Sequence, residues 1–196
     1  MSGIAQHYKP EELVGKSPME IKDAGVALAF VPEDRLGMGL IASSDMVDNM
    51  VLKSYKDEAG AFLHRKKAAD IAKYLIKKLD IATPGIHTPV RMLSGGNVQK
   101  VLLGREIEAG RDVLIVSYPV RGLDINSSYM IYNLLDEERK RGTAIIFVGE
   151  DLDVLMALSD RIMVMADHRI AGITDARTVT KDYLGSLMTD TKGQVI

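Results

Sequence analysis

Two short stretches of the chain carry residue types and spacings that suggest phosphate chemistry. Residues 94–96 read Ser-Gly-Gly and open a predicted helix. The first N–H groups of a helix have no intrahelical partner, and glycines without a Cβ let an anion approach them. The apolar run at 113–116 ends in Ser117 and Tyr118, whereas a strand that serves Mg-dependent phosphoryl transfer is expected to end in carboxylates. The sequence therefore predicts a phosphate-binding entrance beside a strand that lacks acids.

The elements that must position these residues follow an alternating pattern. Short apolar runs alternate with amphipathic helical segments, which is typical of an α/β protein with a largely parallel sheet. We predict four buried strands, then a short edge strand reached through a tight turn, then a terminal helix. These are residues 26–31, 113–116, 144–148 and 161–165, followed by 168–173 and 181–188.

Two helices between the strands are well marked. The segment 125–141 carries a periodic apolar stripe, follows Asp124 as the N-cap and stops at Gly142, which suits the C′ position. The segment 66–80 has small and aliphatic residues on one face and lysines on the other. It lies within residues 44–92, where no strand pattern is present and prolines punctuate the chain. We interpret that stretch as a helical subdomain inserted into the α/β core.

Composition limits the possible functions. With 46% hydrophobic and 27% charged residues, the 196-residue chain is of the ordinary globular class. Its net charge of −2 argues against a nucleic-acid partner, which usually binds a basic domain. The chain has no cysteine, and its four histidines lack metal-ligand spacing, so we predict no metal site. No apolar run approaches the roughly 18 to 20 residues that a membrane span needs.

The order of these motifs carries a family resemblance. The run Leu-Ser-Gly-Gly-Asn at 93–97 is followed by a helix to about residue 109, the apolar strand, and Pro-Val-Arg-Gly-Leu-Asp at 119–124. The chain here resembles the ATP-binding subunits of ABC transporters, whose signature motif, Walker B strand and D-loop follow in this order. We call residues 94–97 the signature loop and residues 119–124 the D-loop turn.

Further stretches resemble one subfamily. Residues 15–21, residues 24–26, Val-Pro-Glu-Asp-Arg at 31–35, and the segment 150–162 look like the second ATP-binding half of importers for simple sugars and nucleosides. The resemblance implies a P-loop NTPase-like α/β fold with an inserted helical subdomain. It divides the chain into residues 1–43, the first part of the core, residues 44–92, the helical subdomain, and residues 93–196, the signature helix and the rest of the core.

The phosphate-cradling loop of such proteins is missing from the sequence. Nowhere do the 196 residues contain Gly-x-x-x-x-Gly-Lys-Ser/Thr, the Walker A motif. By resemblance, this lysine loop and its strand should precede Leu13. We therefore expect the chain to be the C-terminal part of a longer polypeptide, with a naturally truncated protein as the other possibility.

Three further positions depart from the family pattern. Ser117 stands where the Mg-associated aspartate is expected, and a neutral hydroxyl adds no charge to a hard cation. Tyr118 replaces the glutamate that activates water and, with a reference pKa of about 10, is a poor general base. Glu150 replaces the switch histidine, and at about 4 Å it would repel a γ-phosphate by roughly 4 kcal/mol per unit charge at an effective dielectric of 20. We expect no hydrolysis at this chain's own site.

What remains is the half of the site that acts in trans. By resemblance, Ser94 would offer its hydroxyl, and Gly95 and Gly96 their N–H groups, to ATP and Mg held by a partner domain. Asn97 keeps an amide where glutamine is common.

The resemblance also assigns roles outside the signature loop. Asp124 would lie at the seam between the two domains. Glu33, Asp34 and Arg35 would couple to the permease, with an exposed loop carboxylate as the alternative reading of Glu33.

The predicted function is a catalytically degenerate nucleotide-binding domain of an ABC importer for a sugar or nucleoside. It is expected to lie peripherally on the cytoplasmic face of the cell membrane. Its expected partners are a second ATP-binding domain, transmembrane permease subunits and, indirectly, a solute-binding protein. The alternative is a non-hydrolysing structural or regulatory module that docks to a permease or another ATPase. A DNA-maintenance or ribosome-associated ATPase is disfavoured by the acidic charge balance and the segment 32–35.

Overall fold

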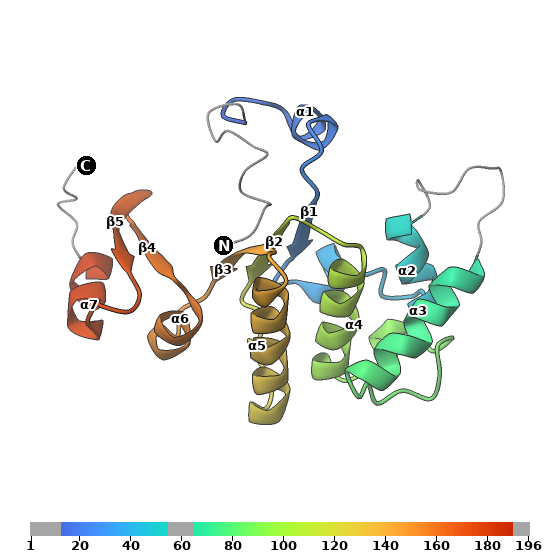
Figure 1. The fold of residues 1–196 in the computed structure, drawn as a ribbon. Helices are drawn as coiled ribbons and strands as arrows, with labels where there is room; N and C mark the ends of the chain where they lie inside the picture. Colours follow the sequence, from blue (N-terminus) through green and yellow to red (C-terminus); the bar gives the residue numbers. More distant parts are fainter. Residues whose placement is uncertain (1–12, 55–64, 190–196) are drawn as a thin grey trace. The chain divides into compact units, whose positions relative to one another are not determined.

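The computed structural model describes residues 13–54 and 65–189. It divides into an N-terminal unit, Met1–Val148, and a C-terminal unit, Gly149–Ile196 (Figure 1). Each unit has its own hydrophobic core. Over the described residues, no helix is both long enough and apolar enough to cross a membrane.

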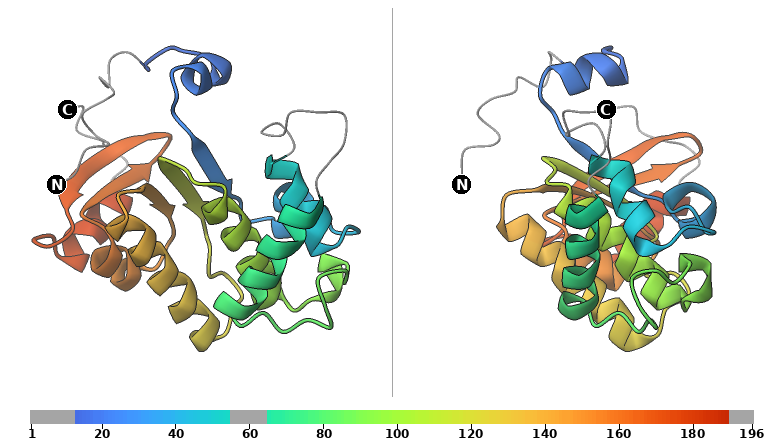
Figure 2. Two further views of the ribbon diagram at one scale, coloured as in Figure 1. Left: turned by 45° about the vertical axis from the view of Figure 1, so that its right-hand side comes forward. Right: turned by 90° about the vertical axis from the view of Figure 1, so that its right-hand side faces the viewer.

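A three-stranded parallel sheet forms the centre of the N-terminal unit. Its strands are β1 (Leu28–Val31), β2 (Val113–Ser117) and β3 (Ala144–Val148), in the order β1-β2-β3. Helix α4 (Gly95–Glu108) leads into β2, and α5 (Ile125–Lys140) connects β2 to β3. Because the strands follow in one direction and such crossovers are right-handed, both helices lie on the same side of the sheet (Figures 1 and 2). The predicted parallel α/β arrangement is confirmed.

The two faces of this sheet differ. On the helix-covered face, alternate residues of β1 and β2 are buried, namely Ala29, Val31, Leu114 and Val116. The opposite face carries exposed apolar side chains, namely Leu28, Phe30, Ile146 and Val148. The prediction of a buried strand at 144–148 was wrong in this respect, because β3 has no fully buried residue. The strand predicted at 26–31 begins at Leu28, two residues later than expected, because the Val26 N–H donates to the Ile21 carbonyl of the preceding helix.

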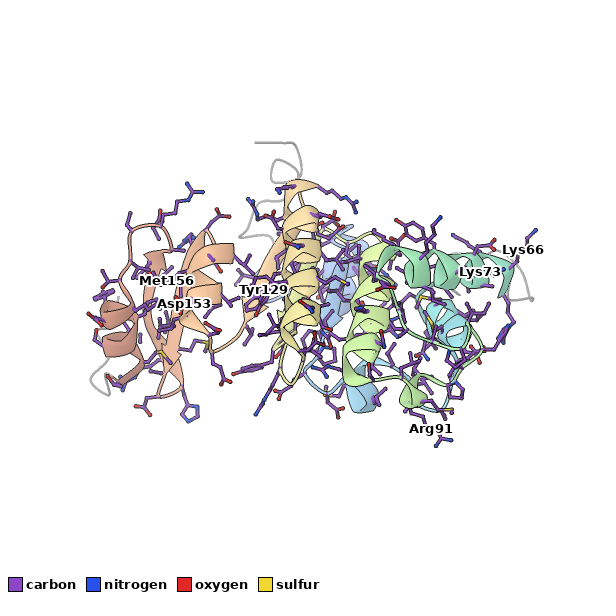
Figure 3. The ribbon with its side chains drawn as sticks, turned by 90° about the horizontal axis from the view of Figure 1, so that it is seen from below. Lys66, Lys73, Arg91, Tyr129, Asp153 and Met156 are labelled. Atoms are coloured by element: carbon purple, nitrogen blue, oxygen red, sulfur yellow. The ribbon has the colours of Figure 1, made fainter. Side chains whose placement is uncertain are left out.

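Over its described residues, 44–54 and 65–92, the segment 44–92 is helical, as predicted. It contains α2 (Met46–Ser54), α3 (Arg65–Lys78) and a 3-10 turn, η3 (Val90–Met92). Buried residues of α3 and α4 belong to one core cluster with those of the sheet. Lys66 and Lys73 of α3 lie on its exposed side (Figure 3). The division into three domains stays a prediction, and residues 1–12 of its first part lie outside the described residues.

Two short elements flank β1. Helix α1 (Pro18–Asp23) begins with a capping box, in which Ser17 and Glu20 exchange side-chain and backbone hydrogen bonds. After β1, the π-helical turn η2 (Arg35–Gly39) is capped by Asp34, whose carboxylate accepts from the Gly37 N–H at 2.9 Å. This turn packs against α4, so that a Cβ at Gly39 would lie 2.7 Å from Leu102.

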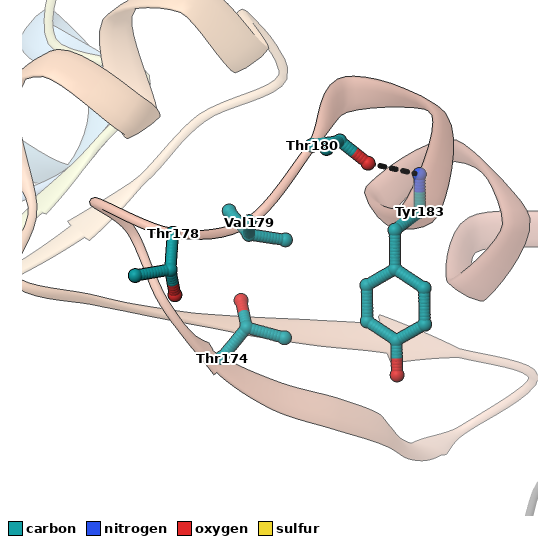
Figure 4. A pocket seen from close by; sticks show the side chains of 5 residues that line it. All are labelled: Thr174, Thr178, Val179, Thr180 and Tyr183. Atoms are coloured by element: carbon teal, nitrogen blue, oxygen red, sulfur yellow. Dashed lines mark hydrogen bonds between the residues drawn. The ribbon is translucent and has the colours of Figure 1, made fainter.

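The C-terminal unit is a hairpin with two helices. Its elements are α6 (Leu152–Leu158), β4 (Arg161–Ala166), β5 (Arg169–Asp175) and α7 (Lys181–Thr189). Strand β4 was expected in the parallel sheet; it pairs with β5 only, in an antiparallel sheet. The predicted tight turn passes through Asp167 and His168, whose positive φ angles return the chain at once and place β5 beside β4. A shallow hydroxyl-rich pocket lies between β5 and α7 (Figure 4).

Candidate functional site

The signature loop forms the N-terminus of α4. Ser94 is the N-cap, and its Oγ accepts hydrogen bonds from the Asn97 N–H at 3.4 Å and from Asn97 Nδ2 at 2.9 Å. The hydroxyl hydrogen of Ser94 therefore remains available to donate. Among the described residues, the N–H groups of Gly95 and Gly96 have no acceptor, as expected at a helix start. The loop thus offers three donors to an anion.

Asn97 has a structural role that the sequence did not indicate. Its Oδ1 accepts from the backbone N–H of Ala82 at 3.0 Å, while its Nδ2 donates to Ser94. The side chain therefore joins the signature loop to the loop that follows α3. Because both its Oδ1 and its Nδ2 have partners within the chain, Asn97 mainly stabilises the loop and is less suited to bind a ligand directly.

The D-loop turn lies against the signature loop. Asp124 is the N-cap of α5, and its carboxylate accepts from the Ser127 N–H at 2.9 Å and the Ser127 hydroxyl at 2.6 Å. These hydrogen bonds hold the pKa of Asp124 below its ordinary value, and the bond from the Ser127 hydroxyl has the larger effect. A Cβ at Gly96 would lie 3.1 Å from Ser127 Oγ. Ser127, three residues after a predicted N-cap, is the contact that sequence reasoning missed.

Residues 33–35, which were expected to face the permease, also contact the signature loop and the D-loop turn. Glu33 forms an ion pair with Arg121 of the D-loop turn, and Arg35 donates through Nη2 to the Arg121 carbonyl. Arg35 Nη1 lies 3.4 Å from the position that a Cβ of Gly95 would take. Burial lowers the pKa of Arg35, and the nearby Glu33 charge acts against that shift.

The end of β2 does not provide a magnesium site. Ser117 is the last residue of the strand, and Tyr118 follows with φ at 47°, its N–H donating to the Val148 carbonyl at 2.8 Å. The Arg121 guanidinium carbon lies 5.8 Å from the centre of the Tyr118 ring. These two residues present hydroxyls and no carboxylate, which does not fit a hard dication. Within residues 13–54 and 65–189, no group of three or more acidic or histidine side chains could hold a metal ion.

The remaining candidates belong to other elements of the chain. Glu150 is an exposed residue of the C-terminal unit, next to Asp151, which caps α6. His87 pairs with Asp45 at 2.8 Å, and His168 lies in the β4–β5 turn, whereas His7 and His64 lie outside the described residues.

Three chain segments therefore meet at one end of the N-terminal unit. They are residues 33–35 after β1, the signature loop, and residues 118–127 after β2. The carboxyl ends of parallel strands meet at one edge of a sheet, where ligands of open α/β folds usually bind. Each segment was a candidate from the sequence; their direct contacts through Arg121 and Ser127 became visible only in the structure.

Comparison with known proteins gives relatives of one kind. No family model matches the chain. It is 34% identical to the guanosine import ATP-binding protein NupO of Bacillus subtilis (strain 168) over 181 residues, which are 91% of the chain and 35% of that protein. It is 35% identical to the ribose import ATP-binding protein RbsA of Lacticaseibacillus paracasei over 192 residues, which are 95% of the chain and 38% of that protein. The chain thus spans somewhat more than a third of the length of these relatives.

Solved structures agree on the fold. A dimeric ATP-binding cassette in a post-hydrolysis state bound to ADP and Pi superposes with a TM-score of 0.69 at 20% identity, covering 84% of this chain and 70% of that one. The inward-facing structure of a putative metal-chelate type ABC transporter gives a TM-score of 0.68 at 15% identity, covering 83% and 63%. The chain is a homologue of the sugar and nucleoside import ATP-binding proteins, and its fold is that of the ABC ATPase cassettes.

Proposed function

We propose that the chain is a nucleotide-binding domain of an ABC importer for a sugar or nucleoside, and that it presents its signature loop to ATP held by the lysine loop of a second ATP-binding domain. The observation that carries this proposal is the donor set at the start of α4. The Ser94 hydroxyl hydrogen and the Gly95 and Gly96 N–H groups are all unused by the described residues and belong to a 14-residue helix. A helix N-terminus of that length favours a bound anion.

The same chain is a poor catalyst at a site of its own. Its sequence contains no lysine loop, and Ser117 and Tyr118 end β2 without a carboxylate. Bound ATP with Mg would supply the terminal phosphate that Ser94, Gly95 and Gly96 orient, and the second domain would provide the lysine and the acids. The two domains would close on ATP and reopen after hydrolysis, and this motion would move the segment 33–35 against permease subunits at the cytoplasmic face of the membrane. A solute-binding protein would be an indirect partner, through the permease.

Association with a partner domain tests the proposal. The chain is titrated with an ATP-binding domain that carries a lysine loop, with and without a fluorescent ATP analogue. We expect association that requires nucleotide, loss of that association in Ser94→Arg, and wild-type association in the control Ser186→Arg, an exposed serine of the C-terminal unit. Nucleotide-independent association would favour the alternative, a non-hydrolysing module that docks to a permease or another ATPase. The chain alone should not hydrolyse Mg-ATP above background.

A further inference from the structure

Two arginines far apart in sequence hold the segments of the site together. Arg121 of the D-loop turn pairs through its guanidinium with Glu33, 88 residues earlier in the chain. Its backbone carbonyl accepts a hydrogen bond from Arg35. One residue thus contacts the segment after β1 through both its side chain and its backbone, which fixes two points of that segment.

Arg35 transmits this placement to the signature loop. One guanidinium nitrogen, Nη2, donates to Arg121, and the other, Nη1, faces Gly95 at 3.4 Å from the position of an absent Cβ. Because Gly95 has no side chain, the Arg35 guanidinium comes close to its backbone and places a positive charge beside it. The neighbouring Gly96 is limited on its other side by Ser127.

We propose that Arg121 is a positioning residue of the signature loop, which acts through Glu33 and Arg35. The ion pair with Glu33 holds the segment 33–35 in the position that places the Arg35 guanidinium against Gly95. The anion affinity of the signature loop then depends on the segment expected to face the permease. This inference rests on the proposed function and adds a residue through which that segment and the nucleotide site influence each other.

The ion pair between Arg121 and Glu33 is exposed, so its test needs a control ion pair of similar exposure. The exposed fractions are 61% for Arg121 and 43% for Glu33, and ion pairs of this kind contribute little to global stability. Arg65 and Asp48 form a nearly equally exposed pair, at 57% and 41%, which joins α3 to α2. Arg65→Met is therefore the matched control for Arg121→Met.

The first experiment uses the isolated chain and needs no partner. Backbone amide chemical shifts are measured by NMR for the wild type, Arg121→Met, Arg65→Met and the exchanged pair Glu33→Arg/Arg121→Glu. We expect Arg121→Met to move the Gly95 and Gly96 amide signals, Arg65→Met to leave them in place, and the exchanged pair to return them toward wild type. Unmoved Gly95 and Gly96 signals in Arg121→Met would overturn the proposal.

The second experiment measures function in the nucleotide-dependent association described above. We expect Arg121→Met to weaken that association by up to about fivefold, the upper end of the range for an exposed ion pair, with Arg121→Lys and the exchanged pair near wild type. Equal weakening by Arg65→Met, or no recovery in the exchanged pair, would contradict a positioning role. If the wild type shows no nucleotide-dependent association, the proposed function fails, and the amide shifts alone then decide whether Arg121 positions the loop.

Discussion

The Glu106 carboxylate, fully buried on α4, lies 2.8 Å from the Lys53 ammonium nitrogen on α2. It also pairs with Arg105 at 2.7 Å, and Arg105 donates to the Gly39 carbonyl at 2.7 Å. Breaking a buried ion pair from one side leaves the other charge uncompensated in a low-dielectric environment. Glu106→Gln should therefore lower the free energy of unfolding by about 3 kcal/mol, measured by urea denaturation.

Glu108→Gln is the control for that variant. Glu108 lies on the same helix, but its side chain is 27% exposed and it meets Lys78 at 3.5 Å. The same substitution should cost less than about 1 kcal/mol there. Equal losses in the two variants would show that burial of Glu106 is not the cause.

Gly104 of α4 lies against Leu75 of α3 and against Leu79, the residue after that helix. A Cβ at this position would lie 2.8 Å from Leu75 and 3.0 Å from Leu79. Alanine gains about 1 kcal/mol of helix propensity over glycine, but overpacking a core costs about 1 to 3 kcal/mol. We expect Gly104→Ala to lower the free energy of unfolding, and Gly185→Ala on α7, where nothing lies within 4 Å, to raise it. Stabilisation in both variants would contradict the close packing.

The Asp124 cap gives the N-terminal unit a pH dependence of defined sign. Hydrogen bonds from Ser127 lower the pKa of Asp124 in the folded chain relative to its ordinary value. The stabilisation is thus present above the ordinary pKa and is lost as the pH falls through the lowered one. In Ser127→Ala, an NMR titration should show the Asp124 pKa closer to its ordinary value. An unchanged titration would mean that Ser127 does not hold the carboxylate.

The sequence predicted the elements better than their partners. The parallel sheet, the N-cap at Asp124 and the helical character of 44–92 follow from local patterns, because periodicity and capping depend on neighbouring residues. The tight turn before β5 was also predicted, but the placement of β4 in the parallel sheet was wrong, because an apolar run does not show which strand it pairs with.

The site shows the same division. Each of its three segments carries a recognisable motif, but the contact of Arg121 with Glu33 joins residues 88 positions apart. A single sequence contains no signal for such a contact, since many exposed carboxylates could pair with Arg121.

Two substitutions of Asn97 distinguish its effect on stability from its effect on anion binding by the signature loop. Its amide accepts from the Ala82 N–H and donates to Ser94 Oγ, and Asn97→Ala removes both hydrogen bonds. A loss of about 1 to 3 kcal/mol in the free energy of unfolding is expected, because each of the two hydrogen bonds contributes about 0.5 to 1.5 kcal/mol. Asn97→Asp keeps the acceptor for Ala82, and its negative charge is favourable at a helix N-terminus. Its free energy of unfolding should therefore be close to that of the wild type. The same charge repels an anion on Gly95 and Gly96, so nucleotide-dependent association should fall more in Asn97→Asp than in Asn97→Ala, as measured by titration of the fluorescent ATP analogue. The opposite order would show that the loop does not hold a phosphate.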